Sequence, residues 1–196
     1  MQVGSRRAII NPQSGTGEHA DYAERLLRGR GYAVERTAGP EDAIEFGRAA
    51  GADGVSEIAV CGGDGTINEV LRGLADSDAL GGPTVGIIPC GTANILADAL
   101  GIRDLRHGVE LADNGPVRKV DVGIADGEPF IVSSIAGLPA DASLAASSDL
   151  KSRFGTFAFV VTGVQEALGF DGIDIELEAT VAGRTETGGG EATCVL

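Results

Sequence analysis

Residues 60–70 read VCGGDGTINEV, and this stretch decides the fold class of the first half of the chain. An apolar run at residues 57–61 leads into the glycine turn of residues 62–65, and a pattern typical of an amphipathic helix follows from Thr66. Glycine lets backbone amides approach an anion closely, and the N-terminus of the following helix attracts negative charge. The order of strand, glycine turn and helix therefore predicts one unit of a parallel sheet whose turn binds an anion.

The same order repeats through the first hundred residues. Strands are predicted at residues 8–10, 33–37, 57–61 and 85–88, and helices at residues 18–28, 40–50, 66–75 and 94–100. Short strands that alternate with helices build a parallel sheet with helices on both faces. We therefore expect an α/β fold of the Rossmann-like kind.

The pattern changes after residue 115. Predicted strands at residues 117–124 and 129–135 flank an Asp126-Gly127 step, which is a strong hairpin signal. Helical periodicity returns at residues 141–146 and 154–168, and residues 173–182 alternate as a strand. We predict a parallel α/β domain at residues 1–115 and a β-rich domain at residues 116–196. A further apolar run begins at residue 192, so the second domain is expected to be incomplete.

Three of the four predicted strands end in glycine turns, at residues 11–17 (NPQSGTG), 62–66 (GGDGT) and 89–94 (PCGTAN). The carboxyl ends of parallel strands share one edge of the sheet, where α/β proteins bind ligands. Three such turns at one edge predict a ligand that carries phosphate groups. A P-loop is excluded, because no glycine in the sequence directly precedes a lysine.

The central turn carries an acidic residue, Asp64, where a phosphate-binding loop usually carries a lysine. An ionised carboxylate beside phosphates is repelled unless a cation lies between them, and Mg²⁺ held by carboxylate, water and phosphate oxygens is such a cation. The alternative is that Asp64 is a turn-forming residue whose side chain bonds nearby backbone. Thr66 and Glu69 also fit a capping box, which is compatible with ligand contact.

Composition excludes several classes of protein. The formal net charge is −14, and only two of the 15 basic residues are lysines, so nucleic acid is not an expected partner. Such an acidic surface suits either a high-salt environment or an ordinary soluble protein. The three cysteines have no paired spacing, which argues against a zinc site or a disulfide framework. Neither a long apolar run nor a signal-peptide layout is present, so a cytoplasmic protein is expected, free or peripheral to a membrane.

The segment GGDGTINEV, preceded by INPQSGTG and followed by IIPCGTANILADALGI, resembles the catalytic domain of the diacylglycerol kinase family, in its bacterial and archaeal lipid-kinase branch. GGDGT alone is shared with NAD kinases and 6-phosphofructokinases, whereas the combination of three turns is specific. The likeness continues in IVSSIAGLPADAS and SSDLKSRFGTFAFVVTGVQEAL. It implies a nucleotide-binding α/β domain followed by the start of a β-sandwich, and transfer of the ATP γ-phosphoryl group to a lipid hydroxyl such as that of diacylglycerol.

The resemblance also implies roles for individual residues. Asp64 is the candidate catalytic residue and the candidate partner of Mg²⁺. The family's general base is an acidic residue from the later part of the sandwich, and no residue of this sequence is assigned to that role. Contacts to ATP are expected from the three turns, from the central signature and from the end of the second strand: Asn11, Ser14, Gly15, Thr37, Gly62, Gly63, Gly65, Thr66, Asn68, Glu69, Gly91 and Thr92.

Partners and alternatives follow from the same residues. The expected substrate is a lipid alcohol, and the apolar stripe within residues 154–168 either packs on the protein core or borders an acyl chain. His19 and His107 are expected in helices and are given no catalytic role. An NAD kinase and a nucleotide-binding module without turnover remain alternatives, and a homodimer is left open.

Overall fold

The computed structural model describes residues 6–15, 17–125, 127–132, 136–137, 173–181, 184–192 and 194–195. The chain divides into two compact units, Met1–Val132 and Ser133–Leu196. The predicted helices at residues 141–146 and 154–168 lie outside the described residues. The first unit reaches beyond residue 115 because a hairpin after that point packs on a helix of the α/β layer. The domain boundary near residue 115 stays a prediction.

A four-stranded parallel sheet forms the centre of the first unit, in the order β2-β1-β3-β4. The sheet and its helices confirm the predicted α/β fold. The elements of this layer are β1 (Arg6–Ile10), α1 (Gly17–Arg28), β2 (Ala33–Arg36), α2 (Asp42–Ala52), β3 (Glu57–Gly62), α3 (Asp64–Asp76), β4 (Thr84–Pro89), α4 (Ile95–Ala99) and α5 (Leu105–Asn114).

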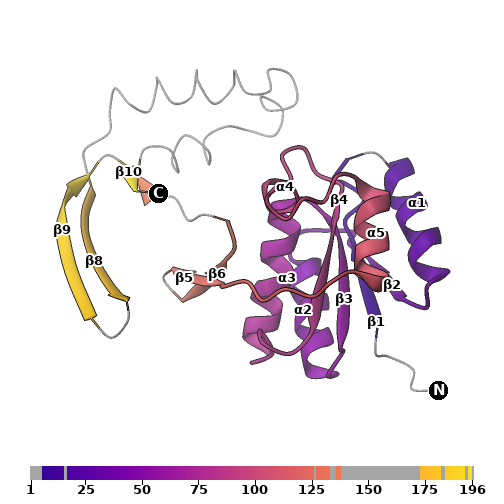
Figure 1. Ribbon diagram of the computed structural model, residues 1–196, viewed down its shortest axis with the longest axis horizontal. Coiled ribbons are helices and arrows are strands. Elements are labelled where there is room, and N and C mark those ends of the chain that lie inside the picture. Colours follow the sequence, from indigo (N-terminus) through magenta and orange to yellow (C-terminus); the bar gives the residue numbers. More distant parts are fainter. Residues whose placement is uncertain are drawn as a thin grey trace. The chain divides into compact units, whose positions relative to one another are not determined.

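Two apolar layers pack this sheet between helices on its two faces (Figure 1). Successive side chains of a strand point to opposite faces, so Ile9 packs toward α2 and α3 while Ile10 packs toward α1 and α5. Val60 and Cys61 of β3 divide in the same way. The central strands are therefore buried on both faces, which explains why each reads as a continuous apolar run.

Helices α2 and α3 approach each other through glycines. A Cβ atom on Gly47 would lie 2.6 Å from the Val70 carbonyl oxygen, and one on Gly73 would lie 2.6 Å from the Arg48 amide nitrogen. The two helix backbones are thus nearly in contact. This packing fixes the second half of α3 against α2.

A short hairpin of β5 (Gly123–Ala125) and β6 (Glu128–Phe130) follows α5. Its two-residue connection confirms the hairpin predicted at Asp126-Gly127. Only the end of the predicted strand at residues 117–124 is β structure, because residues 117–122 have no strand partner. Asn68 and Arg72 of α3 bond the hairpin: Asn68 Oδ1 accepts from the Ile131 amide at 3.1 Å, and Arg72 pairs with Glu128 at 2.9 Å.

The described part of the second unit consists of paired strands. β8 (Ile173–Val181) pairs antiparallel with β9 (Arg184–Ala192), and β7 (Ala136–Gly137) pairs antiparallel with β10 (Cys194–Val195). The strand predicted at residues 173–182 is confirmed, and β-rich structure follows the parallel sheet as expected. β9 was not predicted, because its Gly188, Gly189 and Gly190 are poor strand formers that only the pairing with β8 keeps extended.

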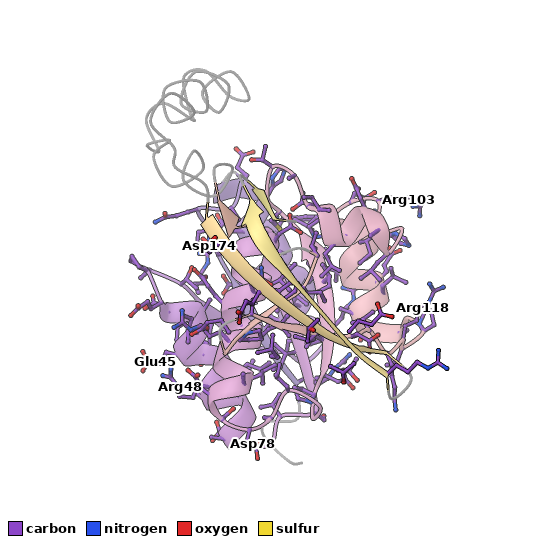
Figure 2. The ribbon with its side chains drawn as sticks, turned by 90° about the vertical axis from the view of Figure 1, so that its left-hand side faces the viewer. Glu45, Arg48, Asp78, Arg103, Arg118 and Asp174 are labelled. Atoms are coloured by element: carbon purple, nitrogen blue, oxygen red, sulfur yellow. The ribbon has the colours of Figure 1, made fainter. Side chains whose placement is uncertain are left out.

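Charged side chains occupy the surface of the first unit. Glu45, Arg48, Asp78 and Arg103 are exposed and point outward (Figure 2). Within the described ranges, no helix is both long and apolar enough to cross a membrane.

Candidate functional site

The three glycine turns lie at the carboxyl edge of the parallel sheet, because each begins at or just after the last residue of a strand. The chain passes from β1 to β2 on one side and continues through β3 on the other side of β1. Ligands of open α/β sheets bind where the strand order reverses in this way. The first turn, which follows β1, and the second turn, which follows β3, therefore flank the position where folds of this kind bind ligands.

Backbone contacts pack the third turn against the other two. Gly15 has φ of 114°, and a Cβ atom there would lie 2.5 Å from the Cys90 carbonyl oxygen. A Cβ atom on Gly91 would lie 2.6 Å from the Cα atom of Gly63. No larger residue fits at Gly15 or Gly91 without separating the turns. The glycines thus set the shape of the site.

Asn11 ties the first turn to the second. Its Oδ1 accepts from the Gln13 amide at 2.9 Å, and its Nδ2 donates to Thr66 Oγ1 at 3.0 Å. The Ser14 amide donates to the Asn11 carbonyl at 3.2 Å, which closes the turn. Thr37 joins the same edge, since its amide donates to the Ile10 carbonyl at 2.9 Å.

The second turn leads into α3 earlier than expected. The helix begins at Asp64 with Gly63 as its N-cap, so the predicted capping box at Thr66 and Glu69 is wrong. Thr66 is instead a buried residue of the first helical turn that accepts from Asn11. The first intrahelical donor is the Ile67 amide, which bonds the Gly63 carbonyl at 3.2 Å. The three preceding amides, at residues 64–66, have no intrahelical acceptor, and such a helix N-terminus is able to bind an anion.

Asp64 does not stand free in the turn. Its Oδ2 accepts from the Ile95 amide and its Oδ1 from the Leu96 amide, both at 3.0 Å. These two donors at the start of α4 partly offset the charge of the carboxylate. Each carboxylate oxygen has a second acceptor position, so water or a cation can still bind Asp64.

Asn94 shapes the third turn, and sequence reasoning did not include it among the site residues. It adopts a left-handed conformation with φ of 50°. Its Oδ1 accepts from the Gly91 amide at 2.9 Å, and its Nδ2 donates to the Gly91 carbonyl at 2.7 Å. The Gly91 amide is thus occupied, and Gly91 contributes shape to the site. A signal was present, because asparagine is enriched in the left-handed region and Asn94 directly precedes a helix.

The remaining candidates lie further along α3 and in the third turn. Asn68 anchors the hairpin through the Ile131 amide, while Thr92 is exposed. Glu69 is partly buried, and desolvation raises the pKa of its carboxyl group. Asn68 is therefore engaged by the protein itself, and the expected ligand contacts of Glu69 and Thr92 stay predictions.

This geometry can be compared with known proteins. The family described as "Diacylglycerol kinase catalytic domain" matches residues 6–125, which include all three glycine turns. The chain belongs to the diacylglycerol kinase catalytic-domain family. The family of lipid kinases expected from the sequence is therefore confirmed.

Individual members of the diacylglycerol kinase family support the same assignment. A protein of Bacillus subtilis named "Diacylglycerol kinase" is 32% identical over 179 residues, which cover 88% of this chain and 58% of that protein. A Shewanella frigidimarina protein named "Probable lipid kinase YegS-like" is 29% identical over 174 residues, covering 87% of this chain and 56% of that protein. The chain thus spans less than two thirds of the length of these relatives.

Solved structures of diacylglycerol kinases have the same fold. One from Bacillus anthracis superposes with a TM-score of 0.66 at 23% identity, covering 99% of this chain and 63% of that one. A second structure from the same organism gives a TM-score of 0.68 at the same identity. At this identity the likeness concerns the fold alone.

The residues present fit the metal that kinase chemistry requires. In the described part of the chain, no group of three or more His, Cys, Asp or Glu side chains forms a ready-made cation site. Mg²⁺ does not need one, because it binds through one or two carboxylates, water and substrate phosphates. In this diacylglycerol kinase family member, Asp64 would supply the carboxylate beside the anion-binding end of α3.

Proposed function

We propose that this chain binds ATP at its three glycine turns, and that the kinase transfers the γ-phosphoryl group to a lipid hydroxyl such as that of diacylglycerol. The observation that carries the proposal is the backbone packing of the three turns around the N-terminus of α3. Membership of a kinase family supports the reaction class, and the relatives' names support a lipid acceptor.

The phosphates of ATP are proposed to contact the amides at the start of α3, since a helix of 13 residues presents a full dipole there. Ser14, Thr37 and Thr92 add hydroxyl groups at the same edge of the sheet. Phosphoryl transfer depends mainly on positioning and charge stabilisation, so this rigid backbone frame suits the reaction. Magnesium, held by Asp64 and by the phosphates, would neutralise the charge on the transferred group.

The acceptor and the location are part of the same proposal. A lipid alcohol would reach the γ-phosphate from a membrane surface, which requires peripheral contact with a bilayer. The hydroxyl must also lose a proton during transfer, and the residue that accepts it is not assigned.

The direct test measures ATP binding by calorimetry and turnover with Mg-ATP. Diacylglycerol and other lipid alcohols serve as acceptors, and NAD is included because GGDGT occurs in NAD kinases. We expect ATP binding and a phosphorylated lipid. Formation of NADP alone would show an NAD kinase, and binding without turnover in a longer chain would show a module without catalysis.

A pair of glycine variants tests whether the turns are the ATP site. Gly15→Ala forces a Cβ atom against the Cys90 carbonyl, so we expect ATP affinity to fall by about tenfold or more, on the order of 1.4 kcal/mol. Gly31→Ala is the matched control, because Gly31 also has positive φ, at 84°, but its Cβ position is open. Both variants carry the strain of alanine at positive φ, of roughly 1–3 kcal/mol. Equal ATP affinity in the two would refute the site.

A further inference from the structure

The second and third glycine turns are joined by side chains as well as by backbone packing. Asp64, the first residue of α3, accepts hydrogen bonds from the Ile95 and Leu96 amides, which follow the third turn. Asn94, between the third turn and α4, bonds both the amide and the carbonyl of Gly91. Gly91 in turn lies against Gly63. Asn94 thus closes the third turn on Gly91, and Asp64 bonds the two residues that follow Asn94.

The energetic terms favour a turn that is already ordered without ligand. Hydrogen bonds from amides to an ionised carboxylate are about twice as strong as neutral ones, and Asp64 accepts two. Asn94 in a left-handed conformation carries backbone strain, which its two bonds to Gly91 offset. Loss of either side chain would loosen residues 91–96, while the Cys90 amide still bonds the Gly62 carbonyl at 3.0 Å.

We propose that Asp64 and Asn94 are positioning residues for nucleotide binding. Before ATP arrives, Asp64 ties the start of α4 to the second turn, and Asn94 fixes the shape of the third turn. The inference rests on the proposed ATP site and deepens it. A preordered site loses less entropy on binding, so the hydrogen bonds of Asp64 and Asn94 contribute to ATP affinity. This role for Asp64 needs no metal and is separate from any contact with Mg²⁺.

Two variants remove the hydrogen bonds of Asp64 and Asn94 in different ways. Asp64→Asn keeps the size of the side chain but has only one oxygen. Its NH2 group therefore faces one of the two backbone N–H donors and cannot accept that hydrogen bond. Asn94→Gly keeps the left-handed backbone free of strain and removes both bonds to Gly91. Asp42→Asn is the matched control, because Asp42 Oδ2 alone accepts the Ala38 and Gly39 amides at 2.7 and 2.9 Å. A single asparagine oxygen can keep both of these bonds, so this control removes only the charge.

Amide hydrogen exchange in the ligand-free protein tests the hydrogen bonds of Asp64 directly. We expect protection of the Ile95 and Leu96 amides to fall by about tenfold or more in Asp64→Asn, as the loss of a net hydrogen bond of about 1.4 kcal/mol implies. The core amides of β1 and β3 keep their protection. Unchanged exchange at both amides would overturn the inference for Asp64, whatever ATP does.

ATP affinity, measured both with EDTA and with excess Mg²⁺, tests the consequence. We expect Asp64→Asn and Asn94→Gly to weaken ATP binding by about tenfold in both solutions, while Asp42→Asn binds like the wild type. A loss in Asp64→Asn that appears only with Mg²⁺ would mean a metal role alone and would overturn the inference. Wild-type protein that binds ATP while both variants bind equally well overturns it too. Wild-type protein that binds no ATP overturns the proposed function, and this inference with it.

Discussion

Glu69 is an acidic residue of α3 that lies one helical turn beyond Gly65 of the central glycine turn. Its carboxyl group is partly buried, and desolvation raises its pKa above the ordinary value of 4.5. A raised pKa means that the folded state binds a proton more tightly than the unfolded state does. The protonated carboxyl therefore favours folding, and the ionised one opposes it.

Glu69 makes the stability of the fold depend on pH. The stability contributed by Glu69 is fully present below its unfolded pKa of about 4.5 and is lost as pH rises through the higher folded value. Because a glutamine side chain does not titrate, we expect Glu69→Gln to gain stability over the wild type between pH 4 and pH 7. Urea unfolding at a series of pH values checks this. A difference between the two proteins that stays constant with pH would contradict it.

Asp64 is a residue that has two interpretations from the sequence alone. Asp64 was expected beside phosphates with only Mg²⁺ to neutralise it, whereas the structure gives it two backbone donors. Those donors come from residues 31 and 32 positions later in the chain, so no local pattern announces them. The alternative, a turn-forming aspartate that bonds nearby backbone, is wrong, because both backbone donors are distant in the chain.

At the scale of elements, the contact between α2 and α3 depends on small residues. Gly73 faces the backbone of α2 near Ile44 and Arg48, and Gly47 faces Val70 of α3. Both glycines are buried within helices. In an exposed helix a glycine costs about 1 kcal/mol relative to alanine, so their presence here indicates a packing requirement.

Two opposing effects decide the outcome of Gly73→Ala. Alanine improves helix propensity by about 1 kcal/mol, but its Cβ atom overlaps backbone atoms that cannot rotate away. Overpacking of this kind costs roughly 1–3 kcal/mol and wins when the neighbour is backbone. We expect a net loss of stability in urea unfolding. Gly17→Ala is the control, since that Cβ position is open, and a stability gain in Gly73→Ala would contradict the helix contact.

At the scale of the whole molecule, the charge is strongly unbalanced. The formal net charge is −14, with 29 acidic and 15 basic residues. The ion pairs of the described residues use arginine as the cation, and most of their side chains are partly exposed. Exposed pairs contribute little, roughly 0–1 kcal/mol each. Repulsion among the excess carboxylates is therefore expected to outweigh them.

Salt should then stabilise the fold. Raising potassium chloride from 0.1 to 1 M shortens the screening length from about 10 to about 3 Å, which weakens the long-range repulsion more than the close ion pairs. We expect the thermal unfolding midpoint to rise over this range. A midpoint that falls would show that the arginine pairs dominate, and the acidic surface would then not be an adaptation to salt.

Much of the fold was predictable, because its signals are local. The strand positions of the parallel sheet, its parallel arrangement and the hairpin at Asp126-Gly127 follow from apolar runs and turn residues next to one another in the chain. The start of α3 was missed by two residues, since Thr66 is a good N-cap by type but Asn11 uses its hydroxyl. β9 was missed because pairing with β8 overrides the weak strand propensity of its glycines.

The sequence by itself determined the α/β class, the three glycine turns and the kinase family, because each is written in short contiguous segments. Only the tertiary structure decided that Gly15 contacts Cys90, that Gly91 contacts Gly63, that Asp64 bonds the Ile95 and Leu96 amides, and that Asn94 bonds Gly91. These contacts, apart from the local Asn94–Gly91 pair, join residues that lie far apart in the chain. They exist only because neighbouring parallel strands deliver their turns to one edge of the sheet.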